Sequence, residues 1–348
     1  MEKITADEAA RLVQDGDAIL ISGSGGGHSV PEALLAAVER RFLAERKPSR
    51  ITSVSIVGIG DRAALGATHL AHEGLLKRAI TSALVDSPGL VRLAAEDKIE
   101  AYTLPQGVLS QLMRDMAAGR PGLLTKTGLH TFVDPRQQGA RQSPCTPPDL
   151  VEVVALAGEE WLFFKPVPVD IAFLRGTTAD EDGNVTMEEE AVLGEMLAMA
   201  QATRRAGGIV VVQVKRMARR NTLPAKQVKI PGILVDFVVV DAEQRLVLHR
   251  DIAVLVGGGP ANERNIDRKW LVAQPFLAID HHQLDQVFLR AGALAAAPLP
   301  GIDEGVEANL GDEPRPPAGD IARDLRQNAL RQGVGFNPVL ERHRDHHG

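Results

Sequence analysis

The sequence predicts an α/β fold in which helices flank an open, mostly parallel sheet. Short apolar runs rich in β-branched residues alternate along the chain with segments of helical periodicity. The run at 209–214 is nearly continuous in β-branched residues, which is typical of a central strand buried on both faces. The 348 residues, 44% of them hydrophobic and 24% charged, are enough for two globular domains.

The elements follow one another in a regular order. Thr5 and Glu8 form a capping box that begins a short helix, and Pro31 with Glu32 begins the helix after a glycine-rich loop. The Gly-, Pro- and Gln-rich stretch 119–148 is expected to be a long loop, and such loops are usually functional. The expected helices cover residues 5–13, 31–44, 70–78, 108–118 and 188–205. The expected strands cover residues 18–21, 51–57, 80–85, 99–104, 171–174, 209–214 and 234–240.

The most informative segment is the glycine-rich loop after the strand at 18–21. Four of the five residues from 23 to 27 are glycine, a composition that is costly in backbone entropy. Such a loop makes sense where a ligand approaches the backbone closely or where φ is positive. A strand, a glycine loop and a helix in this order present backbone N–H groups to an anion or a developing oxyanion. A tight turn in an α/β protein is the alternative interpretation.

Two nucleotide-binding signatures are absent from this loop. The register Gly23-x-Gly25-x-x-His28 breaks the dinucleotide fingerprint at its third glycine, which argues against a nucleotide-dependent oxidoreductase. A P-loop would need Gly-Lys-Ser/Thr at its end. A second glycine pair, Gly58 and Gly60, ends the strand that begins at residue 51. There, close approach of a ligand and a plain turn are equally favoured.

Composition excludes several classes of function. The net charge of −6 argues against general nucleic-acid binding. The first residues lack the apolar segment of a signal peptide. No apolar run reaches the ~18 residues that a membrane span needs, so we expect a cytoplasmic protein without membrane contact. The single cysteine, Cys145, excludes an internal disulfide, and its place among prolines argues against a nucleophilic role.

Other polar clusters have structural explanations. The three acids at 188–190 are expected at the start of a helix, where they would complement its dipole rather than act as a nucleophile. His72 and Glu73 are adjacent on an expected helix and would point in different directions, which favours a structural role. No metal site is expected, because no Cys or carboxylate constellation accompanies the histidines at 281, 282, 343, 346 and 347.

A faint internal repeat suggests two related α/β halves. Residues 17–25 and 251–259 each contain an acid, an apolar strand and a glycine loop, and a proline follows each of them. After Pro260 the pattern degrades, and 298–317 has the composition of a linker. We therefore expect a main domain at 1–240, an incomplete second half at 241–297, and a Pro/Gly/charged linker with a disordered tail at 298–348.

Seven segments, in the right order, resemble one enzyme family. They are residues 4–10, 15–34, 71–78, 105–107, 131–136, 174–186 and 207–214. Residues 1–240 resemble the first, α-type half of the family I CoA-transferases, nearest to the propionate and short-chain acyl-CoA:acetate group. The resemblance implies two α/β halves with an active site at their interface. Residues 1–240 would be the α-type domain, and 241–297 would be a partial β-type remnant.

The resemblance implies ping-pong transfer of coenzyme A between a short-chain acyl-CoA and a small carboxylic acid, with CoA as a substrate and no cofactor. A glutamate attacks the thioester, a mixed anhydride forms, and the returning thiolate gives a glutamyl-CoA thioester. In the family this glutamate belongs to the β-type half, in a Glu-Asn-Gly or Glu-Ser-Gly element that we do not find in this sequence. We therefore expect a β-type partner subunit or a homo-oligomer. A non-catalytic acyl-CoA-binding or regulatory protein is the alternative.

The resemblance also implies site residues. Gln106 matches a position that lines the acyl site, where its amide would donate to an oxyanion; a solvent-facing glutamine is the alternative. Gly26 and Gly27 are expected beside Gln106 at this oxyanion and acyl site. Arg136 and Arg141 lie on the loop expected to cover the acyl group, either paired with a carboxylate or CoA phosphate or simply solvated. The expected substrate-binding residues are Gly23, Gly25, Gly58, Gly60, Gly107 and Arg136.

Overall fold

The computed structural model describes residues 1–25 and 27–244 of the chain. Within these ranges, no helix is long and apolar enough to cross a membrane. Several expectations fall outside the described residues: Gly26, the glycine segment at 251–259, nearly all of the expected remnant at 241–297, the histidines from 281 onward, and the linker and tail at 298–348.

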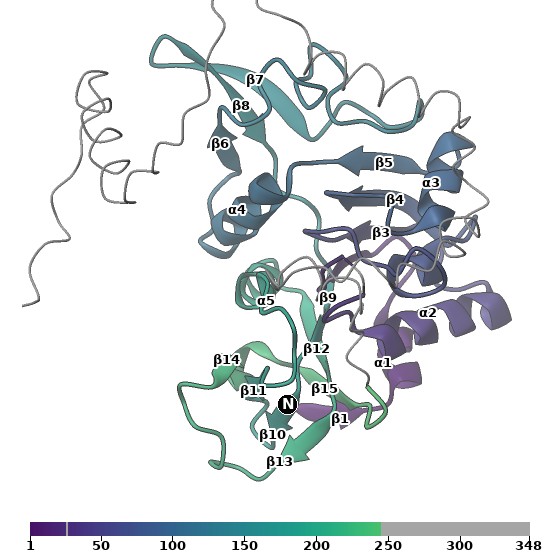
Figure 1. The fold of residues 1–348 in the computed structure, drawn as a ribbon, viewed down its shortest axis with the longest axis vertical. Coiled ribbons are helices and arrows are strands. Elements are labelled where there is room, and N and C mark those ends of the chain that lie inside the picture. Colours follow the sequence, from purple (N-terminus) through teal and green to yellow (C-terminus); the bar gives the residue numbers. More distant parts are fainter. Residues whose placement is uncertain (26, 245–348) are drawn as a thin grey trace, which may run out of the picture. The chain divides into compact units, whose positions relative to one another are not determined.

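The core of the described fold is an eight-stranded sheet in which every neighbouring pair of strands runs parallel (Figure 1). The expected α/β fold with a mostly parallel sheet is therefore confirmed. In spatial order the strands are β1 (Glu2–Ile4), β15 (Phe237–Val240), β12 (Ile209–Val214), β9 (Ile171–Arg175), β2 (Ala18–Ile21), β3 (Ile51–Val54), β4 (Leu76–Thr81) and β5 (Glu100–Thr103).

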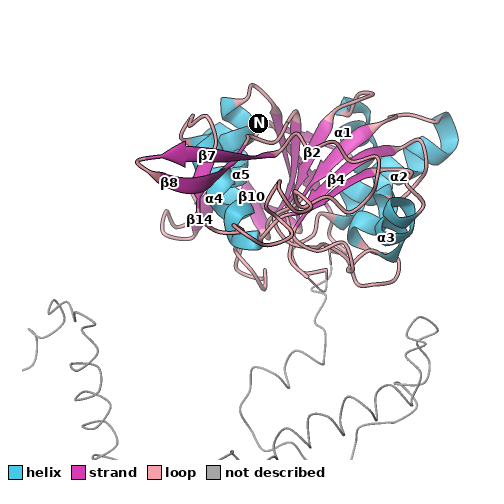
Figure 2. Cartoon of the chain, turned by 90° about the horizontal axis from the view of Figure 1, so that it is seen from above, coloured by secondary structure: helices cyan, strands magenta, loops and turns pink. Residues whose placement is uncertain are grey.

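Helices cover both faces of this sheet (Figure 2). One face carries α1 (Ala6–Leu12), α2 (Glu32–Glu45) and α3 (Pro88–Ala95), and the other carries α4 (Gln106–Ala117) and α5 (Met196–Arg205). Successive side chains of β2 enter the two cores in turn, because Ile19 and Ile21 belong to the core under α2 and Leu20 to the core under α4. Burial on both faces explains why the strands read as continuous apolar runs.

Most of the expected elements of the main sheet are present. At α1 the capping box forms: Thr5 Oγ1 accepts the Glu8 N–H at 3.2 Å, and the Glu8 carboxylate accepts the Thr5 N–H at 2.8 Å. β2 and β12 have the expected bounds, and α2, α4, β5 and β9 differ from theirs by one or two residues. β3 ends at Val54 and β15 begins at Phe237, so both strands are shorter than expected.

The helix expected around 70–78 is wrong. A 3₁₀ turn, η1 (Gly66–Leu70), comes first, and β4 begins at Leu76. Gly74, with φ of +89°, turns the chain between them. The apolar pairs Leu75–Leu76 and Ala79–Ile80 fit a helical period as well as a strand buried on both faces, so periodicity alone misplaced this strand at 80–85.

The helix expected from 188 begins only at Met196. Residues 188–190 lie in a turn before it, so the helix-dipole explanation of these three acids is wrong. Their carboxylates instead form ion pairs with basic side chains from the main sheet and from the strand after it: Glu188 with Arg216, Glu189 with Lys215 and Arg216, and Glu190 with Arg175.

Two small sheets and one helix were not foreseen. The expected loop at 119–148 contains β6 (Leu123–Thr125), which pairs with the hairpin of β7 (Val151–Leu156) and β8 (Glu159–Phe164). The hairpin turns at Ala157 and Gly158, both at positive φ, as a type I′ turn requires. The second small sheet contains β13 (Arg216–Ala218), β10 (Thr178–Asp180), β11 (Val185–Thr186) and β14 (Val228–Ile230), and the unforeseen helix is α3.

Candidate active site

The carboxyl end of β2 is the point where the sheet reverses its winding. From β2 the chain passes through α2 to β3 on one face, and from β9 it passes through α5 to β12 on the other face (Figure 1). β2 and β9 are neighbours in the sheet. Open α/β sheets bind ligands in the crevice outside the carboxyl ends of the strands at such a point. The glycine loop 22–30 lies there because it follows β2.

The glycine loop folds back on itself. The Ser24 N–H donates to the His28 carbonyl oxygen at 2.9 Å, which closes the loop. Gly23 and Gly27 both have positive φ, at +139° and +78°. A Cβ on Gly23 would lie 2.6 Å from Val30 Cγ2. The conformation of the loop therefore requires glycine at position 23 whether or not a ligand is bound.

The two glycine segments predicted from the sequence meet in the structure. Gly25 pairs with Gly60 in a parallel bridge. A Cβ on Gly58 would lie 2.5 Å from Asp86 Oδ2 and 2.6 Å from the Ala83 carbonyl oxygen, and one on Gly60 would overlap the Asp86 carbonyl oxygen. Close packing alone explains why glycine is needed at positions 58 and 60, in line with the interpretation of this segment as a plain turn. Contact of Gly58 and Gly60 with substrate stays a prediction.

A cavity of about 80 Å³ opens beside the glycine loop. One water molecule needs only ~10–15 Å³, so the cavity has room for a ligand of a few heavy atoms. Gln106, the first residue of α4, lines the cavity together with Gly23. The structure thus brings together two of the predicted site residues from the ends of two different strands.

One part of the cavity wall is polar. α4 carries Gln106, Ser110 and Arg114 at intervals of four residues, so these side chains follow one face of the helix. Gln106 and Ser110 line the cavity, as do Ser24 and Glu195. Arg114 Nη2 donates to Glu195 Oε1 at 2.6 Å. Sequence reasoning missed Glu195, because the helix expected over 188–205 placed it inside a helix, where an acid is a common surface residue.

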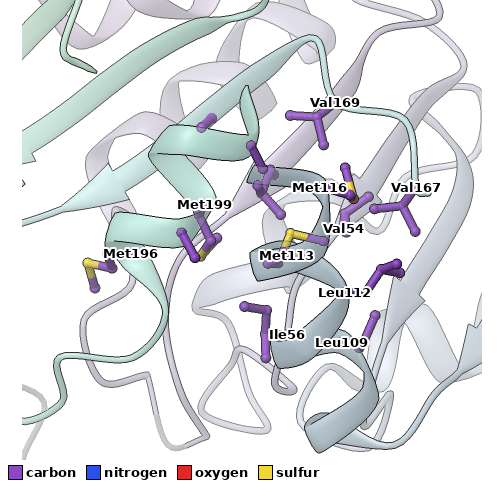
Figure 3. Packing of buried hydrophobic residues seen from close by; sticks show 14 of the residues in the cluster. Val54, Ile56, Leu109, Leu112, Met113, Met116, Val167, Val169, Met196 and Met199 are labelled. Atoms are coloured by element: carbon purple, nitrogen blue, oxygen red, sulfur yellow. The ribbon is translucent and has the colours of Figure 1, made fainter. Parts of the chain in front are cut away.

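The rest of the cavity wall is mostly apolar. Figure 3 shows Met196 and Met199 on α5, next to side chains of α4 in the same core. Methionine adapts to irregular shapes, and a wall of this kind favours a short aliphatic group. The apolar lining residues are Ile21, Ile56, Val57, Val192, Met196 and Met199.

A buried ion pair holds the glycine loop from behind. The side chains of Arg175 and Glu190 are 5% and 2% exposed, and Arg175 Nε donates to Glu190 Oε1 at 3.1 Å. Arg175 Nη1 also donates to the Val30 carbonyl oxygen at 3.2 Å. Ser29 Oγ donates to the Val192 carbonyl oxygen at 3.1 Å. These bonds join the end of the glycine loop to the segment before α5, and both segments contribute to the cavity.

A cluster of carboxylates and histidines supports the start of α2. Glu32 accepts the Gly66 N–H at 3.0 Å. His69 lies between two carboxylates, with Nε2 2.7 Å from Glu32 and Nδ1 2.5 Å from Glu39. Burial opposes the ionisation of His69, but hydrogen bonds to the two carboxylates outweigh it and raise its pKa. His72 Nε2 lies 2.6 Å from Glu39, so His72 belongs to this cluster. Contrary to the expectation from sequence, His72 does not lie on a helix.

Arg136 and Arg141 do not line the cavity. Arg136 forms ion pairs with Asp134 at 2.8 Å and with Glu160 at 2.9 Å. The Asp134 side chain is 1% exposed, and Arg136 holds its pKa well below the usual range. Arg141 Nε donates to the Gln138 carbonyl oxygen at 2.9 Å. Both arginines have local protein partners, and a role in substrate binding stays a prediction.

Three other predicted residues, Gly25, Gly27 and Gly107, do not line the cavity, although they are close in sequence to residues that do. Gly107 follows Gln106 on α4, and nothing lies within 4 Å of the position its Cβ would occupy. Gly25 and Gly27 belong to the glycine loop but not to the cavity wall. Cys145 lies in a separate loop. Among residues 1–25 and 27–244, no group of three or more His, Cys, Asp or Glu is placed to hold a metal ion.

Comparison with known proteins identifies the family of this fold. The family described as Coenzyme A transferase matches residues 3–241. Caffeate CoA-transferase of Acetobacterium woodii is 44% identical over 241 residues, which are 69% of this chain and 46% of that relative. The crystal structure of an acyl-CoA transferase from Escherichia coli O157:H7, in a thioester complex with CoA, is 40% identical with a TM-score of 0.69.

The extent of these matches shows which part of a full-length transferase this chain corresponds to. The solved transferase is matched over 70% of this chain and 50% of that protein. This chain thus spans about half the length of the curated relatives it matches first. Acetate CoA-transferase subunit alpha of Escherichia coli (strain K12) is 24% identical over 243 residues, 70% of this chain and 98% of that subunit. The chain belongs to the Coenzyme A transferase family and corresponds to its α-type half.

Proposed function

We propose that this chain provides the acyl-binding half of an enzyme that moves CoA between a short-chain acyl-CoA and a carboxylate acceptor. The observation that carries the proposal is the cavity shared by the glycine loop and Gln106. It lies where the sheet reverses its winding, and its apolar wall suits a short acyl chain. The family and the names of the relatives support the same reaction class.

The reaction would proceed through two anhydrides. A glutamate carboxylate attacks the thioester carbon of the acyl-CoA, which forms a mixed anhydride and releases the CoA thiolate. The thiolate attacks the glutamyl carbonyl, so the original acid leaves and a glutamyl-CoA thioester remains. The acceptor carboxylate then attacks this thioester and again releases thiolate. Attack of the thiolate on the acceptor's acyl carbon gives the new acyl-CoA and restores the glutamate.

The residues of this chain would stabilise the charge that develops in each attack. The Gln106 amide can donate to the oxyanion of a tetrahedral intermediate. It is the first residue of α4, where unpaired backbone N–H groups and the helix dipole also favour negative charge. The glycine loop lines the same cavity with Gly23 and Ser24, and its backbone N–H groups would add to this stabilisation. N–H donation by Gly26 and Gly27 stays a prediction, because Gly27 does not line the cavity and Gly26 lies outside the described residues.

We propose that the nucleophilic glutamate comes from a β-type partner. Among the described residues, Glu195 is the one carboxylate that lines the cavity, and Glu190 lies behind the glycine loop; each is already engaged in an ion pair. Glu190 is buried against Arg175, and Glu195 is paired with Arg114. A carboxylate whose oxygens accept strong hydrogen bonds from a guanidinium has fewer lone pairs free to attack a thioester, and this supports a glutamate from elsewhere. The relative that this chain covers at 98% of its length is itself named as an alpha subunit.

The test mixes the pure chain with acetyl-CoA and propionate, with and without a β-type subunit, and follows the exchange of CoA. We expect little or no turnover by the chain alone and robust turnover with the β-type subunit. Mass spectrometry after borohydride or hydroxylamine treatment should place the glutamyl adduct on the β-type subunit. Robust exchange by the chain alone, with the adduct on one of its own glutamates, would overturn the assignment of the nucleophile.

A non-catalytic acyl-CoA-binding or regulatory role is the second candidate. It is favoured by the engagement of both nearby carboxylates in ion pairs. The same mixing experiment separates the two functions. If the chain binds acyl-CoA but exchanges no CoA in the presence of a β-type subunit, the regulatory role is correct and the transferase role is not.

A further inference from the structure

Glu195 is the one charged residue that lines the cavity in the described part of the chain. It stands at the N-cap of α5, where its side chain makes no capping hydrogen bond. The side chain is 20% exposed, whereas its partner Arg114 is 54% exposed. The charge that faces a ligand in the cavity is therefore negative, and the positive partner lies further out toward solvent.

The spacing along α4 sets how far an acyl group can reach. Ser110 is four residues from Gln106, about 6 Å along the helix axis, and Arg114 is about 12 Å away. Gln106, Ser110 and Glu195 line the same small cavity, so an acyl group whose carbonyl accepts from Gln106 shares that cavity with Glu195.

We infer that Glu195 restricts this site to acyl groups without a negative charge at their far end, an inference that rests on the proposed function. A terminal carboxylate in the cavity would face the charge of Glu195 at short range, where two like charges repel each other. Arg114 reduces that repulsion without cancelling it, because Glu195 lines the cavity and Arg114 does not. An uncharged chain would instead pack against Met196 and Met199.

The inference predicts how the selectivity can be reversed. Glu195→Gln removes the negative charge, keeps the size of the side chain and loses no helix cap. Arg114 then becomes available for a charge-assisted hydrogen bond to a terminal carboxylate. Glu195 is thus a specificity residue that acts both by its own charge and by withholding Arg114 from the substrate.

The test compares butyryl-CoA with succinyl-CoA, which have four-carbon acyl groups that differ in the terminal carboxylate. The full chain is titrated with each ester by calorimetry, and exchange is measured with each in the presence of a β-type subunit. For the unchanged chain we expect at least about tenfold preference for butyryl-CoA, because its uncharged end is not repelled by Glu195. A tenfold preference corresponds to about 1.4 kcal/mol. Glu195→Gln should shift this ratio at least about tenfold toward succinyl-CoA.

Two further variants make the test specific. Arg114→Gln added to Glu195→Gln should remove the gain in succinyl-CoA binding, because it removes the freed guanidinium. Glu159→Gln, which breaks an ion pair with Lys126 on the β7–β8 hairpin, should leave the ratio unchanged. Thermal unfolding of each variant checks that it is folded. If Glu195→Gln misfolds, Glu195→Ala is measured in its place with the same expectation.

The outcomes separate this inference from the proposed function. If the chain binds or exchanges butyryl-CoA and Glu195→Gln leaves the ratio unchanged, the inference is overturned and the proposed function stands. Equal use of both esters by the unchanged chain also overturns the inference alone. If the chain binds neither ester and exchanges neither with a β-type subunit, the proposed function is overturned and the inference with it.

Discussion

The sequence predicted that the glycine loop 22–30 contacts a ligand and that the stretch 119–148 is a functional loop, yet the structure uses the two differently. The glycine loop follows a central strand and is held by the buried pair of Arg175 and Glu190. The stretch 119–148 packs on β5 at the edge of the sheet, where Ala140 accepts the Thr103 N–H at 2.9 Å. It therefore covers an edge strand that would otherwise present unpaired backbone groups.

This difference shows what loop composition can and cannot indicate. An unusual composition reports that a loop is constrained, by close packing, by turns or by a ligand. The place of the loop in the sheet decides which of these applies. A loop after a central strand lies where ligands bind, whereas a loop beside an edge strand has backbone groups to pair.

The largest effect should come from breaking the buried support of the glycine loop. Arg175→Ala would leave Glu190 buried without its ion-pair partner, and we expect it to lower the free energy of unfolding by about 3–5 kcal/mol. Denaturant unfolding measures this loss. The matched control is Arg141→Ala, because Arg141 lies on the edge-covering stretch and donates to a nearby carbonyl oxygen. If both variants lost the same small amount of unfolding free energy, the glycine loop would not be held more firmly than the stretch 119–148.

Gln106→Ala tests the chemical role of the cavity rather than its support. The Gln106 residue is exposed, so its removal should leave the midpoint of unfolding unchanged. Loss of one oxyanion donor typically lowers kcat by about 10²–10³, and we expect a loss of this size in CoA exchange with a β-type subunit. Gln111→Ala on the same helix, whose amide donates to Asp115, is the control. Unchanged turnover in Gln106→Ala would show that the amide faces solvent.

Sequence reasoning located the main sheet because its signals are local. The capping box at Thr5 and the apolar run of β12 depend on neighbours in the chain, and both were confirmed. β4 was misplaced because its apolar spacing suits a helix as well as a strand, and only pairing with β3 and β5 decides between them. The hairpin of β7 and β8 was missed because it pairs with the three-residue strand β6 and lies outside the main sheet, whose pattern guided the sequence analysis.

The candidate site was predictable only in part, for a similar reason. Gln106 was identified through family resemblance and Gly23 through the glycine content of its loop, and the structure brings them to one cavity. Glu195 carries no sequence signal, since its place in the cavity depends on how α5 packs against α4. Arg136 looked like a ligand for an anion, but whether Asp134 occupies it depends on how the chain folds at that point.

The edge-covering stretch should show its own dependence on pH. Arg136 and backbone N–H groups hold the pKa of buried Asp134 well below its usual value, so the ionised form stabilises the fold. This stabilisation is complete above the unfolded-state pKa of about 3.9 and is lost as the pH falls toward the folded-state value. Asp134→Asn should therefore lower Tm by a few degrees at neutral pH, with a smaller difference at about pH 3. A difference in Tm that stays constant with pH would contradict this role.

The support of α2 should depend on pH in the opposite direction. Glu32 and Glu39 raise the pKa of His69, so the protonated histidine stabilises the fold. That contribution is complete below the unfolded-state pKa of about 6.5 and is lost as the pH rises through the folded-state value. His69→Gln should lower the free energy of unfolding by about 1 kcal/mol at about pH 5.5, and by less in mildly alkaline buffer. Urea unfolding at the two pH values measures the change, and a larger loss at the higher pH would contradict it.

The smallest effect should come from Gly107→Ala, which separates stability from ligand approach. Gly107 lies in the first turn of α4 and has no positive φ, and apart from its own helix no atom lies within 4 Å of the position its Cβ would take. Alanine should therefore raise the free energy of unfolding by about 0.5–1 kcal/mol, because it restricts the unfolded chain. If the substrate approaches the backbone here, as the sequence predicts, the same methyl group should raise KM for the acyl-CoA severalfold. A more stable protein with unchanged KM would show that the glycine serves neither the helix nor the ligand, and would confine the site to the cavity beside Gln106.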